Sequence, residues 1–208
     1  MTDILEALDN LFIIRKDCYP EQLDGLNQYK VVKESITPKI LQDHLRGIIT
    51  IGCFQIDPNT NKVKWICFDF DGDLDEEFSK AKELFLKLKN KGFKPLMEFS
   101  GRRGYHVWLF IEPIDASIAK EFALEISKET KPHELFPKQD KLEINGFGSQ
   151  VKLPLGIHRV SRKWSYFFDE NLQRLSQEEG KTLLIKINDV KRDKITGNLK
   201  KFVSHENF

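Results

Sequence analysis

Two carboxylates stand at the end of an apolar run in the segment WICFDFDGD, residues 65–73. The run has the character of a buried strand. Strand side chains alternate between faces, so Asp69 and Asp71 project from the same side, roughly 7 Å apart. Two carboxylates at this spacing repel each other unless one is protonated or a cation lies between them. The spacing therefore predicts a divalent metal site at this end of the strand.

A second segment, SGRRGYHVWLF at residues 100–110, places basic side chains at a tight turn between apolar strands. Ser100, Arg102 and Arg103 lie within this glycine-bounded turn, and His106 follows on the next strand. Guanidinium groups grip phosphate oxygens with two hydrogen bonds, and a turn rich in N–H donors adds further contacts. We expect these four residues to bind a triphosphate. A metal site beside a phosphate site indicates nucleotide chemistry.

Further along the chain, Lys152 and His158 flank the sequence LPLG and are candidates for the same phosphate site. Two cations about 3.5–4 Å apart need bridging carboxylates. We expect a third acid from elsewhere in the chain; Asp140 is the first choice, with Glu134 and Glu143 as alternatives. Each signal also has an ordinary explanation, because an Asp-x-Asp often ends a strand in a solvated turn and a single histidine in a strand is often structural. The prediction therefore depends on the whole set of residues.

Alternating helices and strands must position these residues. From Lys62 the predicted order is the split β-α-β-β-α-β arrangement of an RRM-like sheet. Upstream, a β-branched strand and the strand carrying the two aspartates flank the turn Pro58–Asn61, which predicts a hairpin. The predicted helices are 3–12 (capped by Thr2), 37–46, 74–91, 117–130 and one that begins after Ser176. The predicted strands are 29–33, 48–56, 62–70, 94–99, 105–112, 135–140, 150–155 and 164–168. Residues 15–20 are expected to be a loop leading into a short helical turn.

The composition fits one large domain with a substantial core. The chain has 208 residues, 40% of them hydrophobic, including 16 Phe, and a formal net charge of +1 that argues neither for nor against nucleic acid. Its three cysteines are widely spaced and are predicted to be buried, reduced thiols. Neither a secretory signal nor a long apolar span is found, so we expect a soluble, cytoplasmic protein with no membrane partner. Basic residues are concentrated in 80–94 and 181–201, which are either solvated faces or contacts to a polyanion.

The motifs FDFD, SGRRGYHVW and QDKLEINGFGSQVKLPLGIH resemble the three motifs of the archaeo-eukaryotic primase superfamily, which includes primase-polymerases. The similarity extends over roughly residues 13–165 and is greatest to the catalytic domains of CRISPR-associated primase-polymerases and of TOTE conflict system primases. The resemblance implies an α+β fold in which an N-terminal α/β module packs against an RRM-like catalytic module. It divides a single catalytic domain, 1–208, into the N-terminal module 1–61, the catalytic module 62–175, and a C-terminal helix with a basic tail, 176–208.

The resemblance also implies the chemistry. Asp69, Asp71 and Asp140 would bind two Mg²⁺ or Mn²⁺ ions and catalyse template-directed nucleotidyl transfer from an NTP or dNTP to a 3′-OH. The phosphates of the incoming nucleotide would contact Ser100, Arg102, Arg103, His106, Lys152 and His158. The implied partner is a DNA or RNA template-primer. The zinc or helix-rich module that often assists initiation in relatives is not found in this sequence, so we expect a catalytic core belonging to a larger protein with an initiation or nuclease module.

Two other functions are open at this point. FDFDGD also resembles the DxDG motif of haloacid-dehalogenase phosphatases, in which Asp69 would be the nucleophile that forms an aspartyl-phosphate. That family has Thr or Val after the glycine, where this chain has Asp73, and the resemblance leaves SGRRGYH and KLPLGIH unexplained. A non-catalytic RRM-like module that binds nucleic acid would instead carry stacking aromatic side chains on the sheet face.

Overall fold

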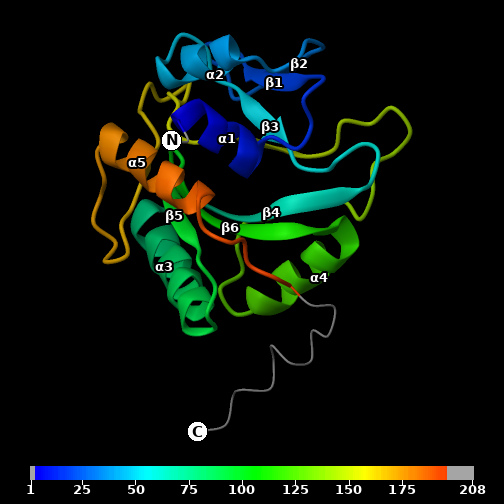
Figure 1. Ribbon diagram of the computed structural model, residues 1–208. Helices are drawn as coiled ribbons and strands as arrows, with labels where there is room; N and C mark the ends of the chain where they lie inside the picture. The colour runs from blue at the N-terminus through cyan, green and yellow to red at the C-terminus, as the bar shows by residue number, and fades with distance from the viewer. Residues whose placement is uncertain (1–2, 196–208) are drawn as a thin grey trace, which may run out of the picture.

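The computed structural model describes residues 3–195. Its centre is a five-stranded sheet in the order β7-β4-β6-β5-β9, in which every neighbouring pair is antiparallel (Figure 1). The longest strands, β4 (Lys62–Asp71) and β6 (Gly104–Asp115), pair with each other in the middle of the sheet. The remaining strands are β5 (Leu96–Phe99), β7 (Glu134–Phe136) and β9 (Tyr166–Phe167).

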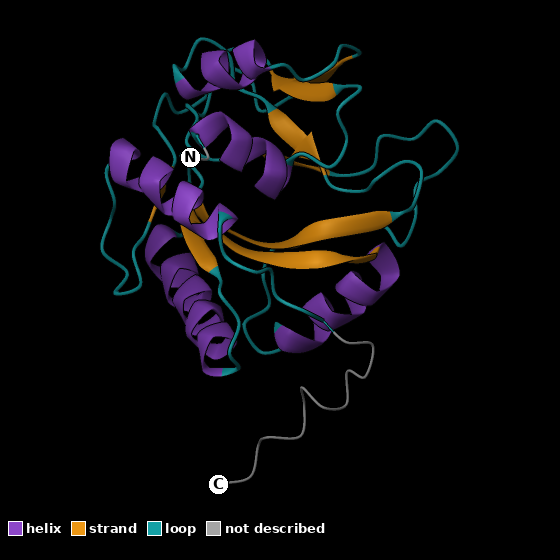
Figure 2. Ribbon diagram, viewed as in Figure 1, coloured by secondary structure: helices purple, strands orange, loops and turns teal. Residues whose placement is uncertain are grey.

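Two helices, α3 (Leu74–Asn90) and α4 (Ala116–Ile126), cover one face of this sheet (Figure 2). Asp73 begins α3 as its N-cap, because its side chain accepts hydrogen bonds from the backbone N–H groups of Asp75 and Glu76. The order of elements from β4 to β7 is β-α-β-β-α-β, as the sequence predicts. The fold is therefore mixed α+β, with its helices and strands packed in layers.

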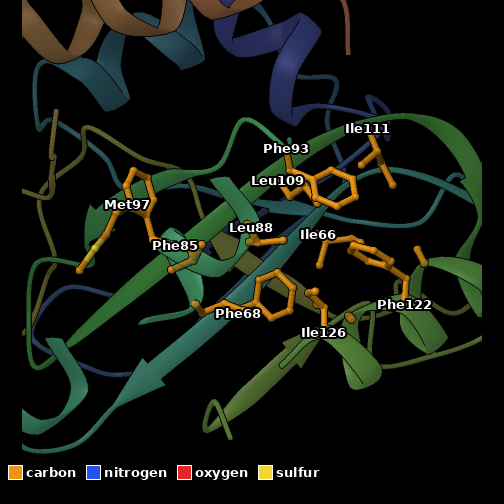
Figure 3. Close-up of a cluster of buried hydrophobic side chains, with 14 of the residues drawn as sticks. Ile66, Phe68, Phe85, Leu88, Phe93, Met97, Leu109, Ile111, Phe122 and Ile126 are labelled. Atoms are coloured by element: carbon orange, nitrogen blue, oxygen red, sulfur yellow. The ribbon is translucent and has the colours of Figure 1, made fainter. Parts of the chain in front are cut away.

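The alternation of side chains along β4 divides the core between the two faces of the sheet. Ile66 and Phe68 face α3 and α4 and pack there in a large cluster of aromatic and aliphatic side chains (Figure 3). Trp65 points to the other face and belongs to a second buried cluster. Asp69 and Asp71 have the same parity as Trp65 along the strand, so they project from this second face. The strand thus carries its carboxylates away from α3 and α4.

The N-terminal part of the chain and the last helix lie on that second face (Figures 1 and 2). Asp3 caps the first helix by accepting a hydrogen bond from Glu6 N–H; Thr2, the predicted cap, lies outside the described residues. Two small antiparallel sheets, β1-β2 and β3-β8, complete this layer. The elements are α1 (Ile4–Phe12), β1 (Tyr19–Gln22), β2 (Tyr29–Val32), α2 (Pro38–Leu45), β3 (Gly52–Phe54), β8 (Gln150–Lys152) and α5 (Gln177–Asn188).

Two local predictions are wrong. Residues 48–56 do not form a hairpin with β4, because β3 pairs with β8 while both edges of β4 are taken by β6 and β7. The intervening turn does form, since Asp57 accepts hydrogen bonds from two following backbone N–H groups, but a turn does not determine which strands pair. The second error concerns residues 15–20, where Tyr19 starts β1 instead of a helical turn because its buried side chain joins the second cluster.

The cysteine prediction is confirmed: Cys18, Cys53 and Cys67 are free and buried. Burial raises the pKa of Cys53 to about 12, so this thiol stays protonated in the core. Within residues 3–195, no helix combines the length and the apolar character needed to cross a bilayer.

Gly104 begins β6 opposite Asp71 of β4, and we expect Gly104→Ala to destabilise the protein. A Cβ at this position would lie 2.3 Å from the Phe70 carbonyl oxygen, so the two strands would have to separate. The expected loss in the free energy of unfolding is about 2–3 kcal/mol, measured by urea denaturation. Gly72→Ala is the control, because its Cβ would meet only the Glu77 side chain, at 3.3 Å. Equal losses for the two variants would contradict this explanation.

Candidate active site

A cavity of about 360 Å³ opens where β4 ends, between the central sheet and the N-terminal strands. It is lined by eight of the nine residues predicted to form the site: Asp69, Asp71, Ser100, Arg102, Arg103, His106, Lys152 and His158. The ninth, Asp140, and the alternative Glu143 are not in the lining, whereas the alternative Glu134 is. The other lining residues are Asn27, Tyr29, His133, Phe136, Gln150 and Val151. Segments far apart in the sequence therefore meet in one polar cavity.

Asp69 lies at the centre of the acidic wall of the cavity. It is directly opposite His106 on β6 and Glu134 on β7, so the three side chains share one face of the sheet. The Nε2 atom of His106 is 3.6 Å from Asp69 Oδ1. Burial raises the pKa of Asp69; His106 opposes this shift, while the charges of Asp71 and Glu134 add to it. The carboxylates on this wall repel one another, and a bound cation would relieve that repulsion.

Asp71 is held by a guanidinium group. Arg103 donates from Nε to Asp71 Oδ1 over 3.0 Å and from Nη2 to Oδ2 over 2.8 Å, a bidentate ion pair. As the side chains stand, no three His, Cys, Asp or Glu residues in the described part of the chain form a metal-binding group. The carboxylates of Asp69, Asp71 and Glu134 nevertheless all line this cavity, and carboxylate oxygens are the ligands that a hard divalent cation prefers. Glu134 also pairs with Lys138, at 2.6 Å. Arg103 supplies the countercharge to Asp71 in this arrangement.

The basic wall of the cavity is the turn between β5 and β6. Ser100 N–H donates to the Gly104 carbonyl over 2.9 Å, which closes the turn. Gly101 has a φ of 97°, a conformation that other residues rarely adopt. Its carbonyl accepts a hydrogen bond from Ser161 Oγ, so the loop that follows β8 braces the turn. This bracing determines where the two arginines of the turn lie.

Lys152 is buried in the cavity wall on β8. Its Nζ donates to Ser165 Oγ over 3.0 Å and to the Leu153 carbonyl over 3.1 Å, and lies 3.7 Å from Glu98 Oε1. Glu98, on β5, is fully buried, and its Oε2 accepts a hydrogen bond from His106 Nδ1 over 3.0 Å. The site thus contains an internal carboxylate behind its basic groups.

Two histidines other than His106, namely His158 and His44, are kept neutral. Burial, together with the charge of Lys152, lowers the pKa of His158 to about 4. Burial likewise lowers the pKa of His44 to about 3. The Nδ1 of His44 accepts from Ile51 N–H over 3.2 Å and its Nε2 donates to the Pro154 carbonyl over 3.0 Å. His44 therefore ties α2 to the LPLG segment and fixes the chain that leads to His158.

Asp140 does not reach the cavity, which corrects the sequence prediction. Its carboxylate pairs with Lys120 of α4 at 3.1 Å, and its side chain is 63% exposed. The predicted strand 135–140 stops at Phe136, because Pro137 has no N–H to donate to the ladder. Glu134, at the start of the same strand, faces the cavity instead. Of the three candidate acids, Glu134 is thus the one that lines the cavity with Asp69 and Asp71.

The lysine-rich helix α3 lies on the opposite face of the sheet from α1 and α5 (Figure 1). The cavity residues Asp69 and Asp71 project from the face that α1 and α5 cover. Lys80 pairs with Glu77, and Lys87 pairs with Glu129. The sheet therefore separates this helix from the cavity, and two of its lysines are already ion-paired. The other basic segment, 181–201, lies partly outside the described residues.

The sequence analysis did not predict two features of the site: the N-terminal strands, which contribute Tyr29, and the buried carboxylate of Glu98. Tyr29 lines the cavity from β2, and burial raises the pKa of its hydroxyl group. The available signal for Tyr29 was weak, since an aromatic residue at the start of a strand is common. Glu98 had a clearer signal, because it is the single charged residue in the apolar strand LMEF.

Residues 26–197 match the family described as TOTE conflict system, Archaeo-Eukaryotic Primase domain. No curated protein matches the chain.

Among solved structures, the AEP domain of the cyanophage S-2L primase-polymerase has a TM-score of 0.52 at 14% identity, covering 88% of this chain and 96% of that one. The catalytic domain of primase RepB′, in complex with initiator DNA, has a TM-score of 0.45 at 10% identity, covering 90% and 94%. The polymerase domain of Mycobacterium tuberculosis Ligase D, in complex with DNA, has a TM-score of 0.42 at 15% identity, covering 84% and 72%. The family match spans most of the chain and the phage domain shares its fold, so this protein belongs to the archaeo-eukaryotic primase superfamily, as a member of its TOTE conflict system branch.

Proposed function

We propose that this domain transfers nucleotides to a 3′-OH on a DNA or RNA template, with NTPs or dNTPs as substrates. The observation that carries the proposal is the single cavity in which an acidic wall, Asp69 with Glu134, faces a basic turn. Nucleotidyl transfer needs both walls, because it brings a polyanionic triphosphate and a hydroxyl nucleophile to one point. Membership in the primase superfamily supports the same reaction.

Asp69, Asp71 and Glu134 are the residues that would hold Mg²⁺ or Mn²⁺, two ions in the proposed reaction. When bound, such ions lower the pKa of an attacking hydroxyl group and neutralise charge on the triphosphate. In the transfer itself, the 3′-hydroxyl gives up its proton to water and its oxygen forms a bond to the α-phosphorus. The bond between the α-phosphorus and the oxygen that bridges the α- and β-phosphates breaks, and pyrophosphate leaves with that oxygen.

The basic side chains would bind and orient the triphosphate. Arg102 and Lys152 bring positive charge to the cavity, and Ser100 adds a hydroxyl donor. Arg103 would exchange Asp71 for a phosphate oxygen, because the two acceptors compete for the same guanidinium fork. The contribution of these groups is positioning and charge stabilisation.

The alternatives left open by the sequence gain no support from the site. The chain belongs to the primase superfamily, which argues against the function suggested by its resemblance to haloacid-dehalogenase phosphatases. A non-catalytic RRM-like module would present exposed stacking aromatics on the sheet face at the cavity. This face presents Asp69, Asp71 and His106, and Phe136, which also lines the cavity from β7, is buried.

A paired assay tests the proposal. We expect templated nucleotide extension in the presence of Mg²⁺ or Mn²⁺, and no hydrolysis of a generic phosphate monoester. Phosphatase activity without nucleotide incorporation would reverse this conclusion. The same extension assay with NTPs and dNTPs in parallel measures which sugar is preferred.

His106→Ala is expected to weaken nucleotide binding by about tenfold and to leave template binding nearly unchanged. The imidazole lines the cavity beside Asp69, so its loss removes a contact to the phosphates. Fluorescence anisotropy of a labelled nucleotide and of a labelled template-primer would measure the two affinities separately. Equal losses in both would mean that His106 supports the fold instead of contacting the nucleotide.

A further inference from the structure

Glu98 is a carboxylate that the proposed reaction does not use directly, yet it contacts two of the groups that would bind the triphosphate. It is 0% exposed, on β5, behind the cavity wall. Its Oε2 accepts hydrogen bonds from His106 Nδ1 over 3.0 Å and from Trp108 Nε1 over 2.8 Å. Its Oε1 has no hydrogen-bond donor and faces Lys152 Nζ at 3.7 Å. A buried ionised carboxylate is costly unless it is paired, so this arrangement needs an explanation.

The charges around Glu98 show that it stays ionised. Burial by itself would raise the pKa of Glu98, but the Lys152 ammonium group and the hydrogen bonds from His106 and Trp108 outweigh this and hold the pKa below its ordinary value. Burial lowers the pKa of Lys152, and Glu98 opposes that shift. The carboxylate and the ammonium group therefore keep each other charged inside the protein.

An ionised carboxylate can only accept hydrogen bonds, so the hydrogen on His106 Nδ1 points to Glu98. The other ring nitrogen, Nε2, faces the cavity next to Asp69. Lys152 uses two of its three N–H groups on Ser165 and Leu153, and the third has only the long contact to Glu98. This third N–H is the one available to a ligand.

We propose that Glu98 is a positioning residue for the triphosphate: it is the internal counter-ion that orients the His106 ring and keeps the Lys152 ammonium group charged at the cavity wall. This inference rests on the proposed function and names a residue that the motifs did not contain. In the ligand-free site, Glu98 balances the positive charges that converge on the cavity. When a phosphate arrives, Lys152 reaches it without leaving its two fixed acceptors.

Glu98→Gln tests the inference, because glutamine keeps the shape and one acceptor but removes the charge. Its amide NH₂ would then face Lys152, donor against donor, and an unpaired buried lysine tends to lose its proton. We expect the dissociation constant for ATP or dATP to rise about tenfold, while kcat at saturating nucleotide changes less than about threefold. The imidazole ¹⁵N shifts would still report hydrogen on Nδ1 of His106, because the side-chain oxygen remains as acceptor.

A double-mutant cycle with Lys152→Met separates positioning from a general effect on the fold. If Glu98 acts through Lys152, the double variant binds nucleotide about as weakly as Lys152→Met alone. Glu77→Gln is the matched control, because Glu77 is also a buried glutamate paired with a lysine but lies on α3, away from the cavity. We expect its nucleotide affinity to stay within about twofold of wild type.

The outcomes distinguish the inference from the function on which it rests. Wild-type protein that neither binds nor incorporates nucleotide would contradict the proposed function, and the inference with it. Wild-type protein that binds nucleotide, with Glu98→Gln binding equally well, would contradict the inference alone. Losses that multiply in the double variant would overturn the role of Glu98 in keeping Lys152 charged, since independent effects would mean that Glu98 does not act through Lys152.

Discussion

Asp69→Asn should lower the rate of templated nucleotide incorporation by roughly a thousandfold while leaving the fold intact. Asparagine has the same shape as aspartate but no charge, so it cannot hold a divalent cation in the same way. Burial, together with the charges of Asp71 and Glu134, raises the pKa of Asp69, which means that the folded protein disfavours the ionised form of this side chain. We therefore expect the thermal unfolding midpoint of the variant to be equal to or higher than that of wild type.

Asp115→Asn provides the matched control for this experiment. Asp115 is exposed and ends β6 opposite Lys62, at the far end of the β4-β6 pair from the cavity. The control should incorporate nucleotide at the wild-type rate. An inactive Asp69→Asn protein with a lowered unfolding midpoint would indicate a structural role for this carboxylate.

Glu134→Gln should lower incorporation by roughly a hundredfold, and Asp140→Asn should have little effect. Glu134 is directly opposite Asp69 on the neighbouring strand and lines the cavity. Asp140 is largely exposed and pairs with Lys120 outside it. The same extension assay at saturating Mn²⁺ compares the two variants under one condition.

The comparison between these two variants is decisive for the third acid. If Asp140→Asn is inactive and Glu134→Gln is not, the segment that follows β7 must rearrange when substrate binds. If both variants are fully active, the site uses only the aspartate pair on β4. Titration of Mn²⁺ into each variant would then show whether metal affinity changes without a change in rate.

Local sequence patterns were sufficient for the parts of the site that lie on single strands and turns. The period of two along a strand places Asp69 and Asp71 on one face, and the apolar residues that alternate with them bury the other. The glycine-bounded turn at 100–104 likewise follows from residue types, because glycine permits the conformation found at Gly101. The start of α5 was recognisable for the same local reason, because Ser176 caps this helix.

Pairing between distant segments was not determined by local pattern. The turn around Asp57 forms as expected, yet β3 pairs with β8, because the edges of β4 are occupied by strands from further along the chain. The choice of Glu134 over Asp140 depends on the register of β7 against β4 and on where that strand ends. Neither can be read from residue spacing alone.

The sequence by itself determined which residue types can do chemistry, on which strands and turns they lie, and that the chain resembles a primase. Only the tertiary structure decided which of the candidate acids lines the cavity with Asp69 and Asp71, that the N-terminal strands contribute Tyr29 to it, and that Glu98 stands behind His106 and Lys152. The physical reason is that side-chain direction follows from the local backbone, whereas contacts between remote segments follow from how the sheet and its covering layers pack together.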